Sequence, residues 1–201
     1  MAARHSLIVV DGFYSRPDIV RERALDLPFE DGEKSGCYVP PRVRRRFERC
    51  IGKPITKWGD VDFGNVYSIN GRFLFSHLQQ RSKPYLPVHQ DLGAYEYTAL
   101  VYLTPQAPSD CGTSFWRHKK TGLAAFPTPH DARRLGTTVS DLVDLTDRNL
   151  DRSNWEEIDR VGNVYNRCVI FRAGRFHSAT RYFGSNTVNG RLVHMFSFST
   201  L

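Results

Sequence analysis

The second half of the sequence is a series of short segments rich in aromatic and β-branched residues, separated by turns that contain glycine, proline or asparagine. Such residues favour the pleated surface of a sheet. Two more strands are expected on either side of Asn70-Gly71, a dipeptide typical of tight hairpin turns. The chain is therefore expected to be mainly β, as an antiparallel sandwich or barrel. The clearest strand segments are residues 97–103, 113–116, 164–171 and 191–198.

Helix signals lie at the periphery of this pattern. A capped helix is expected after Ser15, and a second one over residues 140–150, where apolar residues recur at helical spacing. Residues 28–60 are rich in proline, glycine and charge and are interpreted as a surface excursion. The length of 201 residues suits one domain, and eight short strands would fit a jelly-roll barrel. The expected parts are an N-terminal strand, helix and arginine-rich excursion (1–60) and a barrel core (61–201) with a partly helical insertion (118–160).

The net charge is +7, with 22 arginines against 6 lysines. Arginine holds carboxylates and phosphates through paired hydrogen bonds, so the excess fits an acidic ligand or nucleic acid; a GC-rich genome would explain it equally well. No apolar run approaches the roughly 18 residues of a membrane-spanning helix, and the opening residues lack a secretory signal, so a cytoplasmic protein is expected. The cysteines lack zinc-site spacing and are expected to be free thiols: Cys37, Cys50, Cys111 and Cys168.

His89 and Asp91 are two positions apart, so on a strand their side chains would point to the same face. An imidazole and a carboxylate that converge in this way form two-thirds of a facial two-histidine, one-carboxylate iron site. Chance alone makes such a pair common in a chain with seven histidines. The pair therefore indicates a metal site only if a third ligand comes from elsewhere in the sequence.

His177 is the best-placed third ligand, because it follows a strong strand after a short turn and is followed by small residues that leave space around a metal. His118 and His130 lie in polar segments and are expected to be solvated. His194 lies inside the last strand segment among large apolar residues and is expected to be a packed core histidine.

Arg191 opens the last strand segment, on the same face as Val193 and Met195. An arginine that points inward among apolar residues needs an anionic partner, because an unpaired buried charge is costly. A dicarboxylate held at one end by Arg191 and at the other by the metal would satisfy both groups. The alternative is a surface arginine at the start of a strand.

These motifs occur in an order that resembles the Fe(II)/2-oxoglutarate-dependent oxygenase superfamily, and more closely a small, mostly uncharacterised bacterial branch of it. The resemblance runs from about residue 85 to the C-terminus and more faintly includes VDGFYSRPDIVRERAL near the N-terminus. The motifs that carry it are His89-Gln90-Asp91, CGTSFWRHKKTG (111–122), YNRCVIFRAGRFHSA (165–179), YFG (182–184) and GRLVHMFSF (190–198).

The resemblance implies a double-stranded β-helix, a cupin-like jelly-roll barrel with peripheral helices, in which His89, Asp91 and His177 hold the iron. It also implies an oxidoreductase, a dioxygenase that uses Fe(II), 2-oxoglutarate and O2 to hydroxylate or otherwise oxidise an unactivated C–H bond. Halogenases of this superfamily have a small residue in place of the carboxylate. The presence of Asp91 therefore favours hydroxylation or a related oxidation.

The resemblance further assigns the co-substrate pocket. Arg191 matches the arginine that binds the far carboxylate of 2-oxoglutarate. Thr113 lies in the Gly-Thr pair that commonly follows the second core strand, and Tyr102 is a candidate hydrogen-bond donor to the co-substrate. Arg191 follows His177 at a longer spacing than is usual in the superfamily, which a lengthened turn over residues 184–190 would absorb. Arg181 is the rival carboxylate ligand, and would otherwise face the substrate.

The expected substrate is a small molecule, such as an amino acid or an amino-acid-like biosynthetic intermediate. Arg42, in the arginine-rich excursion, and Trp116 are candidate substrate contacts beside Arg181. The simpler interpretations are a solvated charge run for Arg42 and its neighbours, and a core position for Trp116. Nucleic acid is the weakest candidate partner, because no stacking aromatic residues alternate with the arginines. No membrane contact is expected.

Two other functions remain open at this point. One is a non-catalytic, cupin-like binding module that contacts a partner protein or nucleic acid through its arginines. The other is a metal-dependent isomerase or dioxygenase on the same barrel, which would not need Arg191. The joint presence of His89, Asp91, His177 and Arg191 favours the 2-oxoglutarate-dependent enzyme.

Overall fold

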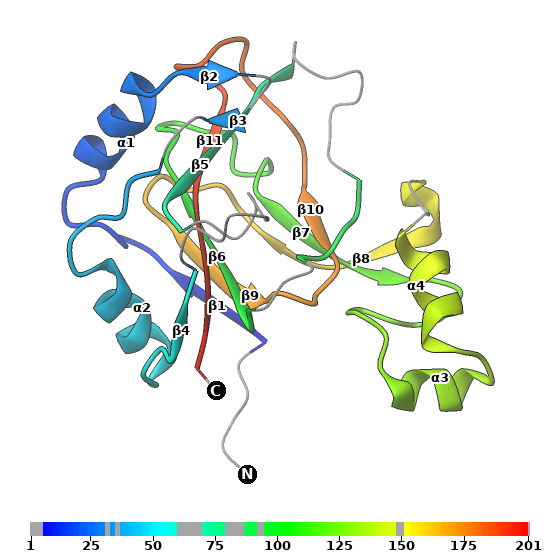
Figure 1. Ribbon diagram of the computed structural model, residues 1–201. Coiled ribbons are helices and arrows are strands. Elements are labelled where there is room, and N and C mark those ends of the chain that lie inside the picture. Colours follow the sequence, from blue (N-terminus) through cyan, green and yellow to red (C-terminus); the bar gives the residue numbers. More distant parts are fainter. Residues whose placement is uncertain are drawn as a thin grey trace.

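The computed structural model describes residues 6–30, 33–34, 37–59, 70–78, 87–91, 95–147 and 151–200. Most of the ordered structure is β, in a six-stranded and a three-stranded antiparallel sheet, and the helices lie around them (Figure 1). The mainly β, antiparallel architecture is therefore confirmed. The first strand of the hairpin expected before Asn70-Gly71 falls at residues 66–69, outside the described residues. Within the described ranges, no helix combines the length and the apolar character needed to cross a membrane.

The large sheet has the strand order β1-β9-β6-β11-β4, with β5 also paired to β11, and the small sheet has the order β10-β7-β8. A two-stranded ribbon joins β2 and β3. The strands are β1 (Leu7–Val10), β2 (Phe29–Glu30), β3 (Glu33–Lys34), β4 (Lys57–Trp58), β5 (Arg72–Ser76), β6 (Tyr97–Tyr102), β7 (Thr113–His118), β8 (Trp155–Val161), β9 (Cys168–Arg172), β10 (His177–Ala179) and β11 (Arg191–Ser199). The helices are α1 (Pro17–Asp26), α2 (Val43–Ile51), α3 (Pro129–Leu135) and α4 (Val139–Asp147), and a 3-10 turn (Arg152–Asn154) precedes β8.

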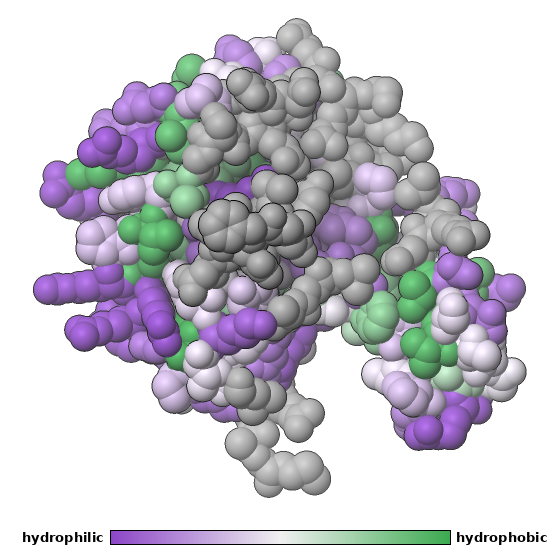
Figure 2. Space-filling model, in the orientation of Figure 1, coloured by the Kyte–Doolittle hydropathy of each residue, from purple (hydrophilic) through white to green (hydrophobic). Residues whose placement is uncertain are grey.

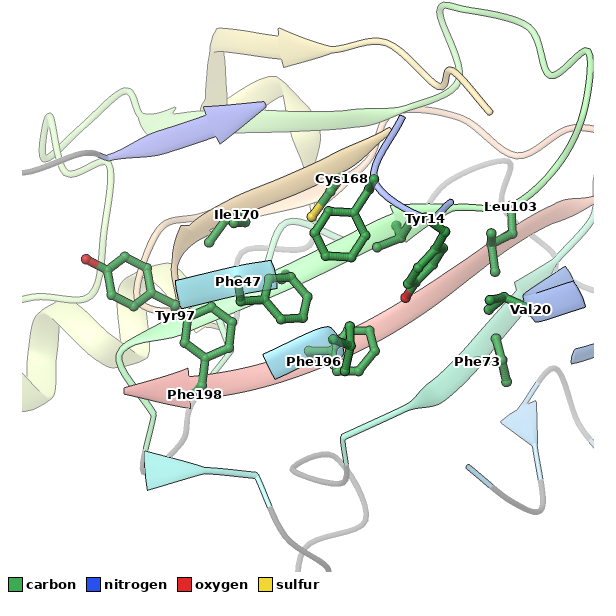
Figure 3. Packing of buried hydrophobic residues seen from close by; sticks show 14 of the residues in the cluster. Tyr14, Val20, Phe47, Phe73, Tyr97, Leu103, Cys168, Ile170, Phe196 and Phe198 are labelled. Carbon is green, nitrogen blue, oxygen red and sulfur yellow. The ribbon is translucent and has the colours of Figure 1, made fainter. Parts of the chain in front are cut away.

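The outer face of the large sheet carries the main hydrophobic core, which α1 and α2 cover (Figures 1 and 3). Phe47 of α2 packs at ring-centroid distances of 5.0 Å from Phe196 and 5.2 Å from Phe198. Val43, Phe47 and Ile51 recur at helical spacing and are all buried. The expectation of a surface excursion over residues 28–60 is therefore wrong for α2, whose arginines point outward while its apolar stripe enters the core. Figure 2 shows hydrophilic side chains gathered over α1 and α2.

The inner face of the large sheet packs against the small sheet. Alternation along β6 sends Ala99 and Val101 to the outer core and Leu100 and Tyr102 inward. Across the gap, Phe115 of β7 meets the inward residues of the large sheet. The space between the two sheets is therefore lined by apolar side chains from both.

The helical insertion covers the other face of the small sheet. Leu142 of α4 packs with Trp116, Trp155 and Phe176 in a separate hydrophobic cluster. The helix expected over residues 140–150 is observed as α4, and α3 begins with a capping box in which Thr128 and Asp131 satisfy each other's backbone amides. In Figure 1 the two helices stand at the side of the molecule away from α1 and α2.

His194 is confirmed as a core histidine. Its Nε2 donates to the carbonyl of Tyr38 at 2.8 Å, so its Nδ1 accepts from the hydroxyl of Tyr14 at 2.9 Å. The ring stacks on Phe73 at 4.1 Å. Burial lowers the pKa of His194 to about 3, so the histidine is neutral in the folded protein near pH 7.

The free energy of unfolding is expected to decrease as the pH falls below 6.5, because His194 is buried in its neutral form. Its pKa is about 3 in the folded state and 6.5 when unperturbed, so below pH 6.5 the unfolded chain binds a proton that the folded protein excludes. The resulting loss is about 1.4 kcal/mol per pH unit between pH 6 and pH 4. Urea unfolding at pH 7, 6 and 5 measures it. His194→Gln keeps a donor and an acceptor without titrating, and should show a shallower pH dependence; equal slopes in both proteins would contradict the assignment.

Candidate metal centre

His89 and His177 are brought together by a two-way backbone bridge. The amide of His89 donates to the carbonyl of His177 at 2.9 Å, and the amide of His177 donates back to the carbonyl of His89 at 2.7 Å. Residues paired in this way project their side chains from the same face. The two imidazole rings accordingly lie with their centroids 4.4 Å apart.

Both imidazoles are held in the tautomer that binds metals. Nδ1 of His89 lies 3.0 Å from the carbonyl oxygen of Pro87, and Nδ1 of His177 lies 2.9 Å from that of Arg175. A carbonyl oxygen only accepts, so each Nδ1 carries a proton, which leaves Nε2 of each ring as the nitrogen available to a metal. Burial lowers the pKa of His177 to about 4, with the neighbouring Asp91 opposing this effect. The His177 imidazole is therefore neutral near pH 7.

Asp91 completes a cluster of three ligands. Its backbone amide donates to the carbonyl of Ala173 at 3.0 Å, and its Oδ2 accepts from the hydroxyl of Thr98 at 2.6 Å. Oδ2 lies 3.6 Å from Nε2 of His177, and one ligand atom from each of the three residues lies within 4.8 Å of the others. Asp91 is partly exposed, so the cluster opens on one side. The structure thus unites the three residues expected as metal ligands.

A second polar cluster lies between the sheets at the other end of β6. The hydroxyl of Tyr102 donates to Oγ1 of Thr113 at 2.7 Å, and Nη2 of Arg191 lies 3.5 Å from the same oxygen. The Arg191 guanidinium stands 5.7 Å from the centroid of the Tyr102 ring. All three residues expected around the co-substrate therefore meet, and Tyr102 points inward. We refer to these three residues as the anion pocket.

Arg191 is buried in this pocket with only 6% of its surface exposed. Among the described residues no carboxylate pairs with it, and its buried Nε has no hydrogen-bond partner. Burial lowers its pKa, an effect that the phenols of Tyr102 and Tyr182 oppose. A buried guanidinium without an acid is unfavourable unless an anion binds there. The pocket has the chemistry of a carboxylate site.

Backbone contacts fix both sides of the pocket. The hydroxyl of Thr104 donates to the carbonyl of Gly190 at 2.6 Å and accepts from the amide of Leu192 at 2.9 Å, so it holds the chain on either side of Arg191. A Cβ on Gly112, next to Thr113, would lie 1.9 Å from the carbonyl oxygen of Val161, so only glycine fits this approach to β8.

The three candidate substrate residues lie elsewhere. Arg42 precedes α2, the helix that covers the outer face of the large sheet, opposite the triad. Arg181 is exposed and forms an ion pair with Asp110. Trp116 points away from the space between the sheets, and its Nε1 donates to Oγ of Ser178 at 3.0 Å. The structure brings none of the three to the triad.

Two further expectations are settled by burial. The expectation that His118 is solvated is wrong: the residue is buried on the outer face of the small sheet, with its Nδ1 3.0 Å from Oγ1 of Thr121. The turn closed by Thr121 folds back over the ring. The polar composition of the segment does not indicate this burial. His130 is exposed as expected. All four cysteines are free, as expected.

Sequence reasoning missed Arg152, which fastens β10 from the outer face. Its guanidinium donates to the carbonyls of Thr180 at 3.0 Å and Ala179 at 2.8 Å, and to Oγ of Ser178 at 2.7 Å. It also covers the Trp116 ring at 4.9 Å. These contacts hold the strand that carries His177. No motif marks them, because Arg152 lies in a polar segment far from β10 in the sequence.

The model of the family described as "Family of unknown function (DUF6445)" matches residues 1–196. The chain belongs to this family. No curated protein matches the chain.

Several solved structures are similar to the chain. A prolyl-4-hydroxylase from Pseudomonas putida is 11% identical, with 96% of this chain and 92% of that chain covered and a TM-score of 0.46. The non-haem, α-ketoglutarate-dependent epimerase SnoN from nogalamycin biosynthesis is 13% identical, with 97% and 78% covered and a TM-score of 0.47. HygX from Streptomyces hygroscopicus, with iron bound, is 15% identical, with 96% and 81% covered and a TM-score of 0.43.

Proposed function

We propose that the protein is a non-haem Fe(II)- and 2-oxoglutarate-dependent dioxygenase built on a double-stranded β-helix. The observation that carries the proposal is the combination, between two facing sheets, of a metal-ligand triad with a buried arginine that pairs with no carboxylate of the described residues. The triad alone would suit several divalent metals, and the arginine alone would suit any small anion. Together they suit a dicarboxylate that chelates the metal at one end and binds the arginine through the carboxylate at its other end.

The triad fits Fe(II). Two imidazole nitrogens and one carboxylate on a face, with an open side, are the donor set of non-haem iron oxygenases. His89, His177 and Asp91 would hold the ion. The carbonyl oxygens that accept from Nδ1 of each histidine, and the Thr98 hydroxyl that donates to Asp91, orient these ligands. Hydrogen bonds to the ligands have this role at most metal sites.

The anion pocket fits the far carboxylate of 2-oxoglutarate. Thr98, which binds Asp91, and Tyr102 of the pocket are four residues apart on the same face of β6, about 13 Å along the strand. A five-carbon dicarboxylate, together with the side chains of the metal ligands at one end and of Arg191 at the other, is long enough to span that separation. Arg191 would bind the carboxylate, with Tyr102 and Thr113 as hydrogen-bond partners.

Fe(II) with 2-oxoglutarate and O2 would supply the oxidation of an unactivated C–H bond. The chain's own residues contribute position and shelter. Leu100, Val193 and Phe171 line the space between the two clusters and keep water from it. Asp91 occupies the carboxylate position, so hydroxylation or a related oxidation is the proposed reaction. The proposed substrate is a small, amino-acid-like molecule in the cytoplasm.

An anaerobic titration with Fe(II) and then 2-oxoglutarate tests the proposal. The expected result is a weak visible charge-transfer band that saturates with 2-oxoglutarate and is absent in His89→Ala. Metal binding without a band would favour a metal-dependent enzyme that does not use 2-oxoglutarate. Failure to bind metal would leave the non-catalytic binding module, with the exposed arginines of α2 as its contact surface.

A further inference from the structure

A row of four side chains crosses the inner face of the small sheet. The cross-strand pairs are His89 with His177, His177 with Phe115 and Phe115 with Asp159. Directly opposite residues in antiparallel strands project to the same face. Since neighbouring strands lie about 4.8 Å apart, Asp159 stands about 10 Å from His177, with the Phe115 ring between them.

Arg175 connects His177 with Asp159, the far end of this row. Its carbonyl oxygen holds Nδ1 of His177, and its side chain lies across Phe115 with the guanidinium 4.4 Å from the ring centroid. Its Nη2 donates to Oδ2 of Asp159 at 2.6 Å. The side chain of Arg175 is 11% exposed and that of Asp159 is 49% exposed. A charged pair therefore faces the same space as the metal ligands.

Arg175 and Asp159 have hydrogen-bonding groups that remain available to a ligand. A guanidinium has five N–H donors, and among the described residues Nη2 is the one guanidinium nitrogen of Arg175 with a hydrogen-bond partner. A carboxylate can therefore bind the remaining donors. The half-exposed carboxylate of Asp159 can accept from an ammonium group on the solvent side.

The position of the pair is independent of the anion pocket. Thr113 of the anion pocket and Phe115 are two residues apart on β7, so the anion pocket is displaced from Phe115 along the strand. Asp159 is displaced from Phe115 across the strands. The two cationic sites thus lie in different directions, and both can be filled at once.

We infer that Arg175 and Asp159 are the substrate-recognition pair, and that they bind the carboxylate and the ammonium group of an α-amino acid. The inference rests on the proposed function. The substrate side chain would extend over Phe115 toward the metal ligands, within the roughly 10 Å that separates Asp159 from His177. The α-amino acid carries one positive and one negative charge, as does the pair of Arg175 and Asp159. Binding therefore leaves the net charge of the site unchanged.

The experiment is a binding screen on the Fe(II)- and 2-oxoglutarate-loaded protein under anaerobic conditions. The probes are the twenty L-amino acids, and each binder is then compared with its carboxamide and its N-acetyl derivative by calorimetry. At least one amino acid should bind, and each derivative should bind about 10- to 100-fold more weakly, the usual effect of a lost charge-assisted hydrogen bond.

Two variants assign these preferences to the pair. Arg175→Gln should weaken the amino acid about 10- to 100-fold and remove its advantage over the carboxamide. Asp159→Asn should remove its advantage over the N-acetyl derivative. The matched control is Arg160→Gln, which breaks a similar ion pair with Glu157 on the opposite face of the same strand. It should leave both preferences unchanged.

The outcomes separate this inference from the proposed function, because the 2-oxoglutarate band is measured on each protein first. No band in the wild type overturns the proposed function. A normal band with no amino acid bound overturns the inference alone. So does a normal band with binding that Arg175→Gln and Asp159→Asn leave as strong and as selective as before, which would make the ion pair a structural link between β8 and the turn before β10.

Discussion

Arg191→Met is expected to weaken 2-oxoglutarate binding about 30-fold to more than 1,000-fold, while the ligand-free protein loses no stability. Removing one partner of a buried, hydrogen-bonded charge pair costs about 2–5 kcal/mol. In the ligand-free protein, by contrast, Arg191 is buried and no described carboxylate pairs with it. Replacing such a charge by an apolar side chain of similar length removes a desolvation penalty. The measurements are the 2-oxoglutarate dependence of the charge-transfer band and urea unfolding without ligands.

Arg181→Met is the matched control. Arg181 is exposed and pairs with Asp110 at the surface, where an ion pair contributes little. The Arg181→Met variant should therefore bind 2-oxoglutarate as tightly as the wild type does. A large loss in Arg181→Met with none in Arg191→Met would transfer the carboxylate role to Arg181. Unchanged 2-oxoglutarate binding in both variants would contradict a carboxylate-binding role for either arginine.

The strands that could be predicted are those with local signals. Residues 97–103 and 191–198 are expected as strands and are observed as β6 and β11, because their aromatic and β-branched residues are buried on both faces. The small sheet is harder to predict. β8 is WEEIDRV, a charged segment with buried residues only at its two ends, and β10 has only three residues. Both exist through pairing with β7, which no local pattern encodes.

The helix α2 escapes prediction for a related reason. Five arginines between residues 42 and 49 dominate the composition of the segment, and they conceal three apolar residues at helical spacing. Burial of Phe47 against the last strand depends on tertiary packing, which the local composition does not show.

The candidate site divides in the same way. The metal triad and Arg191 could be expected from spacing and alternation, and Tyr102 and Thr113 from the resemblance alone. The hydroxyls that orient them, Thr98 and Thr104, could not, because they act across hydrogen bonds to chain segments that the fold brings close. Trp116 is a candidate substrate contact in the sequence, yet it is the neighbour of Phe115 on β7 and faces the other way. A shift of one residue along a strand reverses the face, and only the register decides it.

A divalent metal is expected to raise the melting temperature of the wild type by about 5–10 °C, and His177→Leu should abolish the increase. Free metal at about 100 times its dissociation constant stabilises the folded state by about 2.7 kcal/mol, and each kcal/mol shifts the melting temperature of a chain this long by about 2–4 °C. The three ligands come from segments that only the fold unites, so unfolding disperses the site. Leucine fills the buried position of His177 without offering a lone pair. Thermal unfolding with increasing Fe(II), under anaerobic conditions, measures the shift.

His118→Leu provides the control for this variant. His118 is also buried on the small sheet, but β7 directs it to the opposite face, where it contacts Thr121 and Trp155. Its loss should lower the melting temperature with and without metal by the same amount, so the metal-induced increase persists. An increase that survives in His177→Leu, or that disappears in His118→Leu, would place the metal outside the triad, because a ligand set acts through its own lone pairs and a core histidine acts only through packing.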